Sequence, residues 1–198
     1  SRGLGDVYKR QPVVPSADFR GRTGLGDYAD FLVETDHVLG QVLGALDESG
    51  VADDTLVLFT SDNGFAPYVK IPELEAAGQR PSAGWRGAKA DIYEGGHRVP
   101  FLVRWPGKIE PSSRLETPVH QIDLLPTLAS LSGADPPERL DGVDLSPLFQ
   151  GKPIPDRSLF WHFPAYLQGY GKDLGSPFQH FRTTPCGVIR QCDFKLIE

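Results

Sequence analysis

The stretch Thr55-Leu56-Val57-Leu58-Phe59-Thr60-Ser61-Asp62-Asn63-Gly64 decides the fold. Its first six residues form a run without polar alternation, which is typical of a strand covered on both faces in a parallel sheet. Residues 26–48 repeat apolar side chains every three or four positions, the pattern of an amphipathic helix, and Gly50 predicts its end. A helix, a short turn and a buried strand make half of a βαβ unit. The sequence therefore predicts an α/β fold with a mostly parallel sheet flanked by helices.

The same patterns predict further elements along the chain. Acidic positions of the first helix, Asp30 and Glu34 among them, are interpreted as its solvated face. A second helix is expected at 120–132, with Pro126 in its first turn, where a missing N–H costs little. The Pro, Gly and Asp content of 133–155 predicts a surface loop. Strands are expected at 99–105, 158–163, 188–189 and 194–197.

Composition excludes several classes of function. The chain has 198 residues, with 20 basic and 26 acidic side chains and a formal charge of −6, which argues against a nucleic-acid partner. No apolar run approaches the roughly 18 residues that a membrane span needs. Cys186 and Cys192 stand six positions apart, so either a hairpin disulfide or two free thiols is open. The absence of Met predicts a processed chain or a piece of a longer one.

Hard oxygen ligands follow the first predicted strand. In an open α/β sheet, ligands bind beyond the carboxyl ends of the strands, which is where Asp62 and Asn63 stand. Carboxylate and amide oxygens suit Ca²⁺ or Mg²⁺, and Gly64 lets the backbone turn away. The alternative interpretation is an Asx turn that closes the strand, because Asp-Asn-Gly favours turns on local grounds alone.

A lysine lies between glycines just before the next predicted strand. Lys89 follows Gly87 and precedes Gly95 and Gly96, a setting in which its ammonium group can approach an anion closely. An ordinary surface lysine is the alternative. His97 and His162 are interpreted as turn or rim residues rather than catalytic groups.

These residues carry a family resemblance. The chain resembles the type I sulfatases, the arylsulfatase-like branch of the alkaline phosphatase superfamily, in colinear order from Pro12 to Glu198. The resemblance implies part of an alkaline-phosphatase-like α/β sandwich with the start of a C-terminal antiparallel subdomain. The motifs that carry it are Leu58–Gly64, Gly87–Lys89, Tyr93–Pro100, Arg104–Gly107, Asp123–Thr127, Asp141–Asp144, Trp161–Pro164 and Asp193–Ile197.

The resemblance implies domain limits. Residues 12–155 would be part of the sulfatase catalytic domain, and 156–198 its end with a truncated start of the C-terminal subdomain. Residues 1–11 have no helical or strand period and resemble a translated sequencing adapter, so they are expected not to be native. Export to the periplasm, the lysosome or the cell exterior is also implied.

The resemblance further implies hydrolysis of a sulfate ester at one divalent cation, usually calcium. Asp62 and Asn63 would be two calcium ligands, and Lys89 would contact the sulfate and neutralise charge on the bridging oxygen. The substrate would be a small-molecule or carbohydrate sulfate ester. Candidates for contacts with it, besides Lys89, are His97, His162, Tyr166 and Tyr170.

One feature of the family is missing. The nucleophile of these enzymes is a formylglycine made from a Cys/Ser-x-Pro-x-Arg motif, and the sequence contains no such motif. The formylglycine and the remaining calcium carboxylates are expected upstream, so the chain as given is expected to be inactive. Two alternatives stay open: a phosphatase or phosphonate hydrolase of the same superfamily, and a non-catalytic domain that binds sulfate or calcium.

Overall fold

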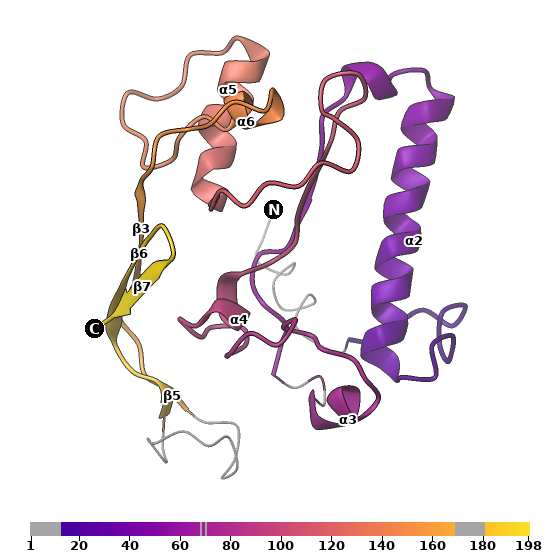
Figure 1. Cartoon of the computed structure of the whole chain (residues 1–198). Coiled ribbons are helices and arrows are strands. Elements are labelled where there is room, and N and C mark those ends of the chain that lie inside the picture. Colours follow the sequence, from indigo (N-terminus) through magenta and orange to yellow (C-terminus); the bar gives the residue numbers. More distant parts are fainter. Residues whose placement is uncertain (1–12, 68, 70, 169–180) are drawn as a thin grey trace. The chain divides into compact units, whose positions relative to one another are not determined.

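The computed structural model describes residues 13–67, 69, 71–168 and 181–198. The chain forms two compact units, Ser1–Leu102 and Val103–Glu198, and each is considered by itself. Helices and strands alternate in the first unit and antiparallel strands close the second, so the fold is α/β with an antiparallel C-terminal part (Figure 1). None of the helices in the described ranges combines the length and apolar character that crossing a bilayer requires.

The first unit is built from the predicted helix and strand. Helix α2 spans Asp27–Glu48, the short 3-10 helix η1 spans Ala52–Asp54, and strand β1 spans Val57–Thr60. These elements confirm the helix and strand predicted from apolar spacing. Gly50 follows α2 with a φ of 68°, the left-handed conformation of a helix stop. Two short helices, α3 (Ile71–Ala76) and α4 (Glu94–His97), precede β2 (Phe101–Arg104), which is hydrogen-bonded to β1.

Burial in this unit is lower than the sequence predicted. All four residues of β1 are half-buried rather than fully covered, because β1 has β2 as its neighbour in a two-stranded sheet of the described residues. On α2, the apolar side chains of Phe31, Leu32 and Val42 are 40%, 45% and 49% exposed. Helix α2 therefore carries the predicted row of apolar side chains, but the described part of the chain does not bury them.

Asp30 was predicted to be solvated, and that prediction is wrong. The residue is 1% exposed, and its carboxylate accepts hydrogen bonds from Gly21 N at 2.6 Å, Thr23 N at 2.8 Å and Thr23 Oγ1 at 2.7 Å. The hydroxyl of Thr23, then its backbone N–H, lowers the pKa of Asp30. Asp30 therefore fastens the loop that precedes α2 to the first turns of the helix. Periodicity could not reveal this role, because most of the donors are backbone groups.

The second unit combines a short helix with an antiparallel sheet. A 3-10 turn η2 (Gln121–Asp123) leads into α5 (Leu124–Ser132), so Pro126 lies in the first turn as predicted, and Gly133 ends the helix with a φ of 69°. Strands β3 (Ser158–Phe163), β6 (Cys186–Gln191) and β7 (Phe194–Ile197) form one antiparallel sheet in that order. They confirm the three C-terminal strands predicted.

Three elements of this unit were not predicted. The one-turn helix α6 (Ser146–Phe149) interrupts the predicted surface loop 133–155, and Pro147 lies at its start. Strands β4 (Leu167–Gln168) and β5 (Phe181–Thr183) pair with each other at positions for which the sequence predicted no strand. These elements are two to four residues long, too short for apolar periodicity to show them.

The two cysteines do not form a disulfide. Both thiols are free; Cys186 begins β6 and Cys192 lies in the turn to β7. Strand β6 separates the two cysteines, and its six residues rise by about 3.3 Å each. The Cα atoms of Cys186 and Cys192 are therefore farther apart than the roughly 7 Å that a disulfide allows. Of the two interpretations left open by the sequence, free thiols is therefore correct.

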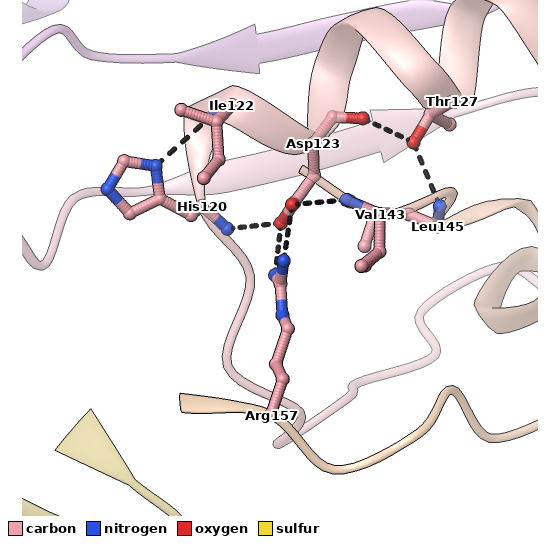
Figure 2. A network of polar contacts seen from close by, with 7 residues as sticks. All are labelled: His120, Ile122, Asp123, Thr127, Val143, Leu145 and Arg157. Carbon is pink, nitrogen blue, oxygen red and sulfur yellow. Dashed lines mark hydrogen bonds and ion pairs between the residues drawn. The ribbon is translucent and has the colours of Figure 1, made fainter. Parts of the chain in front are cut away.

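A buried charge organises the second unit (Figure 2). Asp123 is fully buried, and both nitrogens at the end of the Arg157 guanidinium group bind its carboxylate. The backbone N–H groups of His120 and Val143 donate to the same carboxylate at 2.7 Å and 3.0 Å. One side chain thus joins the start of α5, the loop before α6 and the residue that precedes β3.

Thr127 and His120 extend this network. The Thr127 hydroxyl donates to the Asp123 carbonyl oxygen at 2.6 Å and accepts from Leu145 N at 2.9 Å. The Nδ1 atom of His120 accepts from Ile122 N at 3.2 Å, and its ring centroid lies 5.6 Å from that of Trp161 on β3. The irregular segments around α5 are therefore held by side-chain contacts rather than by a sheet.

We expect Arg157→Met to destabilise the second unit strongly. Removing one partner leaves the buried Asp123 carboxylate uncompensated, which costs about 3–5 kcal/mol. Urea unfolding followed by tryptophan fluorescence measures the change. Arg139→Met, at an exposed loop position, is the control and should change the unfolding free energy by less than about 0.5 kcal/mol. Similar unfolding midpoints for the two variants would contradict a stabilising role for the ion pair.

The His120 contacts predict a pH dependence. Burial, followed by the charge of Arg157 as a smaller cause, lowers the pKa of His120 below 6.5, although Asp123 opposes the shift. The unfolded chain then binds the extra proton more readily, so stability falls as the pH drops through and below about 6.5. In His120→Asn the side-chain oxygen still accepts from Ile122 N, but the titrating group is gone. Unfolding free energies between pH 7.5 and 5 should decline less steeply in this variant; parallel declines would contradict the assignment.

Candidate functional site

The residues after β1 form a tight turn. Ser61 Oγ donates to the Asn63 carbonyl oxygen at 2.9 Å, and Asn63 Nδ2 donates to the Gly64 carbonyl oxygen at 2.9 Å. Neither bond is that of an Asx turn, in which a side-chain oxygen accepts from a backbone N–H two positions on, because Gly64 N donates to the Gly96 carbonyl oxygen instead. The Asn63 amide nitrogen faces the backbone, and within the described residues its Oδ1 atom accepts no hydrogen bond, which is compatible with ligand binding. Asp62 is exposed, and in the described residues its carboxylate accepts no hydrogen bond.

The loop that carries Lys89 is fixed by its own backbone. Ala88 N donates to Asp91 Oδ2 at 2.8 Å, and Asp91 N donates back to the Ala88 carbonyl oxygen at 2.9 Å. Gly87 has a φ of 91°, a conformation that side-chain-bearing residues rarely adopt. Lys89 N donates to the Phe65 carbonyl oxygen at 2.9 Å, which ties the lysine directly to the turn after β1.

Three glycines bring these loops to backbone distance. Gly64 N donates to the Gly96 carbonyl oxygen at 2.8 Å, and Gly95 N donates to the Arg86 carbonyl oxygen at 2.7 Å. A Cβ atom at Gly64 would lie 1.8 Å from the Gly95 oxygen, and one at Gly96 would lie 2.1 Å from the Asp91 oxygen. We call Gly64, Gly95 and Gly96 the glycine contact. None of these three positions has room for a side chain. The glycine contact holds the Asp62-Asn63 turn against the Lys89 loop.

The structure places the predicted site residues as follows. Asp62, Asn63 and Lys89 come together in the first unit through these backbone bonds, and His97 lies on α4, with Nε2 3.4 Å from Glu94 Oε1. His162 is an exposed residue of β3 in the second unit. Tyr166 is 63% exposed, and Tyr170 lies outside the described residues.

Sequence reasoning missed an aromatic and cationic group beside the lysine. Arg98 lies over the Trp85 ring, with its guanidinium carbon 4.4 Å from the centroid, and Arg86 lies 3.8 Å over Tyr93. The signal that could have found part of this group is the Glu94–Arg98 spacing of four residues, which places opposite charges on one side of a helical turn.

The donors present fit a calcium ion chemically but make only part of a site. Ca²⁺ takes six to eight oxygen ligands, and Asp62 and Asn63 provide carboxylate and amide oxygens of the required kind. In the portion of the chain that the structure describes, no cluster of three or more His, Cys, Asp or Glu side chains could hold a metal. Further donors would have to come from water, substrate or other residues.

The chain combines an α/β fold with hard oxygen donors after a strand and a lysine whose backbone is fixed beside them by hydrogen bonds. The chain belongs to the sulfatase family: the family model described as Sulfatase matches residues 6–134. A second model, for the C-terminal part of N-sulphoglucosamine sulphohydrolase, matches residues 84–197. These matches confirm the predicted family.

Relatives agree with this assignment. Steryl-sulfatase of Rattus norvegicus is 43% identical over 157 residues, which cover 76% of this chain and 26% of the relative. A solved Bacteroides thetaiotaomicron protein, described under the metabolism of multiple glycosaminoglycans, superposes with a TM-score of 0.75 at 28% identity, over 96% of this chain and 36% of that one. The phosphonate monoester hydrolase of Silicibacter pomeroyi gives 0.61 at 26% identity, over 87% and 32%. The chain thus spans about a quarter to a third of the length of these relatives.

Gly96→Ala should loosen the junction between the two loops. The new Cβ atom would overlap the Asp91 carbonyl oxygen, so the backbone must shift, at a cost of about 1–3 kcal/mol. Hydrogen exchange of the Gly64 amide, which donates to Gly96, should become faster. Gly44→Ala on α2 is the control, because a Cβ atom there meets open space and alanine favours a helix. Unchanged protection of Gly64 in Gly96→Ala would contradict the structural role of the contact.

Proposed function

We propose that the protein carrying this chain hydrolyses sulfate esters, R–O–SO₃⁻ plus water to R–OH plus SO₄²⁻ and a proton, and that this chain supplies two cation ligands and the sulfate-binding lysine. The observation that carries the proposal is the glycine contact together with the Lys89–Phe65 bond. These bonds hold a cationic side chain and two hard oxygen donors on one rigid frame, which suits a transition state in which negative charge grows on the leaving oxygen.

Lys89 would act on the leaving group. As the S–O bond breaks, negative charge grows on the bridging oxygen and spreads over the sulfuryl oxygens, as in phosphoryl transfer. An ammonium group held by a fixed backbone stabilises that charge without having to reorganise during the reaction. Asp62 and Asn63 would hold a calcium ion, which when bound supplies Lewis-acid stabilisation and orients the sulfate. The formylglycine nucleophile would come from residues outside this chain, so the chain alone would be inactive.

The substrate we propose is a sulfated carbohydrate or another small sulfate ester. The structural relative described under glycosaminoglycan metabolism supports the carbohydrate class. His97 and His162 would contribute substrate contacts, and Tyr166 and Tyr170 are further candidates. We also propose export from the cytoplasm and a division of the family-like part into residues 12–155 and 156–198.

A second candidate function is cleavage of phosphate monoesters or phosphonates. The similarity to a phosphonate monoester hydrolase is the observation in its favour. Phosphoryl and sulfuryl groups are both tetrahedral oxyanions, so the same lysine and cation would serve either one. The sulfatase family models favour sulfate. A non-catalytic domain that binds sulfate or calcium is the third possibility.

The test uses the complete reading frame, expressed together with a formylglycine-generating enzyme. We expect hydrolysis of 4-nitrophenyl sulfate to exceed that of 4-nitrophenyl phosphate and of a phenylphosphonate ester. Lys89→Ala should lower kcat/KM for the sulfate ester about 10²–10³-fold, the usual effect of losing one transition-state donor. Lys108→Ala, an exposed lysine in the loop after β2, is the matched control and should retain activity. Preference for the phosphorus esters would favour the second candidate, and no turnover with intact cation binding the third.

Cation binding gives a readout that does not depend on turnover. Calorimetric titration with Ca²⁺ should show weaker binding in Asp62→Ala, because one anionic ligand is lost. Asp36→Ala removes an equal charge from the exposed side of α2 and serves as the control. Equal calcium affinity in the two variants would exclude Asp62 as a ligand.

A further inference from the structure

We propose that Trp85 and Arg98 form a subsite that binds a second sulfate group of a polysulfated sugar. The inference rests on the proposed function and names the substrate class of the same site. Neither residue belongs to the cation ligands or to the sulfate-binding lysine. Their geometry, hydrogen bonding and position relative to the glycine contact all support the assignment.

The Trp85–Arg98 pair is held ready at the surface. The Arg98 guanidinium carbon lies 4.4 Å from the centroid of the Trp85 ring, within the range of a cation–π contact. The Arg98 side chain is 43% exposed and Trp85 is 44% exposed. Stacking limits the rotamers of a long flexible side chain, so an anion that binds there immobilises less of it. The pair is therefore both accessible and preorganised.

The hydrogen-bond donors of this pair are left for a ligand. Glu94 is the carboxylate beside Arg98, but the Nη1–Oε2 distance is 3.6 Å, too long for a hydrogen bond. Glu94 also lies 3.4 Å from the His97 ring nitrogen, so its charge is shared. Across the described residues, neither the Arg98 guanidinium nor the Trp85 indole N–H donates a hydrogen bond. A planar fork of donors with a neighbouring N–H matches two oxygens of a sulfate group.

The pair is tied to the lysine loop at both ends. Trp85 stands four positions before Lys89, and Arg98 stands two positions after Gly96 of the glycine contact. The bond from Gly95 N to the Arg86 carbonyl oxygen, 2.7 Å long, links the backbone next to Trp85 with the helical turn that leads to Arg98. A displacement of the subsite relative to Lys89 would therefore require breaking backbone hydrogen bonds.

The local charge favours a polyanion. From Trp85 to Arg98 the sequence has three cations, Arg86, Lys89 and Arg98, against two carboxylates, Asp91 and Glu94, a net of +1 in a chain of −6. The Asp91 carboxylate is turned toward the backbone, where it accepts from Ala88 N. A positive segment in an acidic chain attracts a ligand that carries several sulfate groups more strongly than one that carries a single group.

The test compares two substrates on the full-length enzyme. 4-Nitrophenyl sulfate carries one sulfate and no sugar, whereas glucosamine 2-N,6-O-disulfate carries a second sulfate. Arg98→Gln should raise KM about tenfold for the disulfated sugar, the effect of losing a hydrogen bond to a charged group, with kcat nearly unchanged. It should change kcat/KM for the aryl sulfate less than about twofold. Trp85→Leu, which leaves the charge but removes the stack, should raise KM of the sugar by about threefold.

Two controls keep the proposal falsifiable. Arg80→Gln removes an exposed arginine from the loop after α3 and should affect neither substrate. Arg98→Lys keeps the charge but not the planar fork, so it should restore only part of the sugar affinity. Equal losses on both substrates, or unchanged sugar KM in Arg98→Gln, would overturn the subsite.

Calorimetric binding of the disulfated sugar provides a readout that is independent of turnover. Weaker binding by Arg98→Gln than by Arg80→Gln supports the subsite, and equal binding overturns it. If the parent protein hydrolyses neither compound, the proposed function fails while this binding comparison still decides the subsite. The two proposals are thereby tested separately.

Discussion

The close approach of Gly64 to Gly95 and Gly96 is the constraint on which the candidate site depends. A Cβ atom at any of the three positions would lie 1.8–2.2 Å from a backbone oxygen, far inside van der Waals contact. Because main chain packs on main chain here, the positions of Asp62 and Lys89 are set by hydrogen bonds that leave little freedom. Long side chains reaching across a gap could not achieve that precision without losing entropy. The glycines thus fix the backbone of the Asp62-Asn63 turn against the backbone of the Lys89 loop.

In the second unit, segments of the chain are held together by a buried ion pair rather than by close contacts between glycines. The segments around α5 have little regular structure, and Asp123 joins them by accepting four hydrogen bonds, two of them from Arg157. Burying such a pair costs solvation energy, and the four hydrogen bonds to the Asp123 carboxylate offset part of that cost, although the Arg157 Nε atom has no partner among the described residues. The arrangement specifies one path for these loops, since any other path leaves a buried carboxylate unsatisfied.

Periodicity predicted the elements that are long enough to show it: α2, β1, α5, β3, β6 and β7. Residue type and position at a strand end point to Asp62 and Asn63, and the family resemblance points to Lys89; their roles as ligands stay a prediction. Asp30 and Asp123 were beyond such reasoning. Both are buried carboxylates whose donors are largely backbone N–H groups or a residue 34 positions away, and neither kind of donor leaves a pattern near the acid. The glycines were visible in the sequence, but which of them face each other is a property of the fold.

Aspartate and arginine side chains therefore have different roles in the two units. The hydrogen bonds that each side chain makes distinguish a structural role from a predicted binding role. Asp123 is buried and accepts four hydrogen bonds, two of them from the half-buried Arg157, whereas Asp62 is exposed and accepts no hydrogen bond within the described residues. Arg98 lies over an aromatic ring and 3.6 Å from the Glu94 carboxylate, contacts that restrict its position although its guanidinium group donates no hydrogen bond within the described residues. A charged side chain of this kind has no internal hydrogen bond to break before it binds a ligand. Hydrogen bonding thus distinguishes Asp123, which holds the segments around α5 together, from Asp62, whose role as a cation ligand stays a prediction.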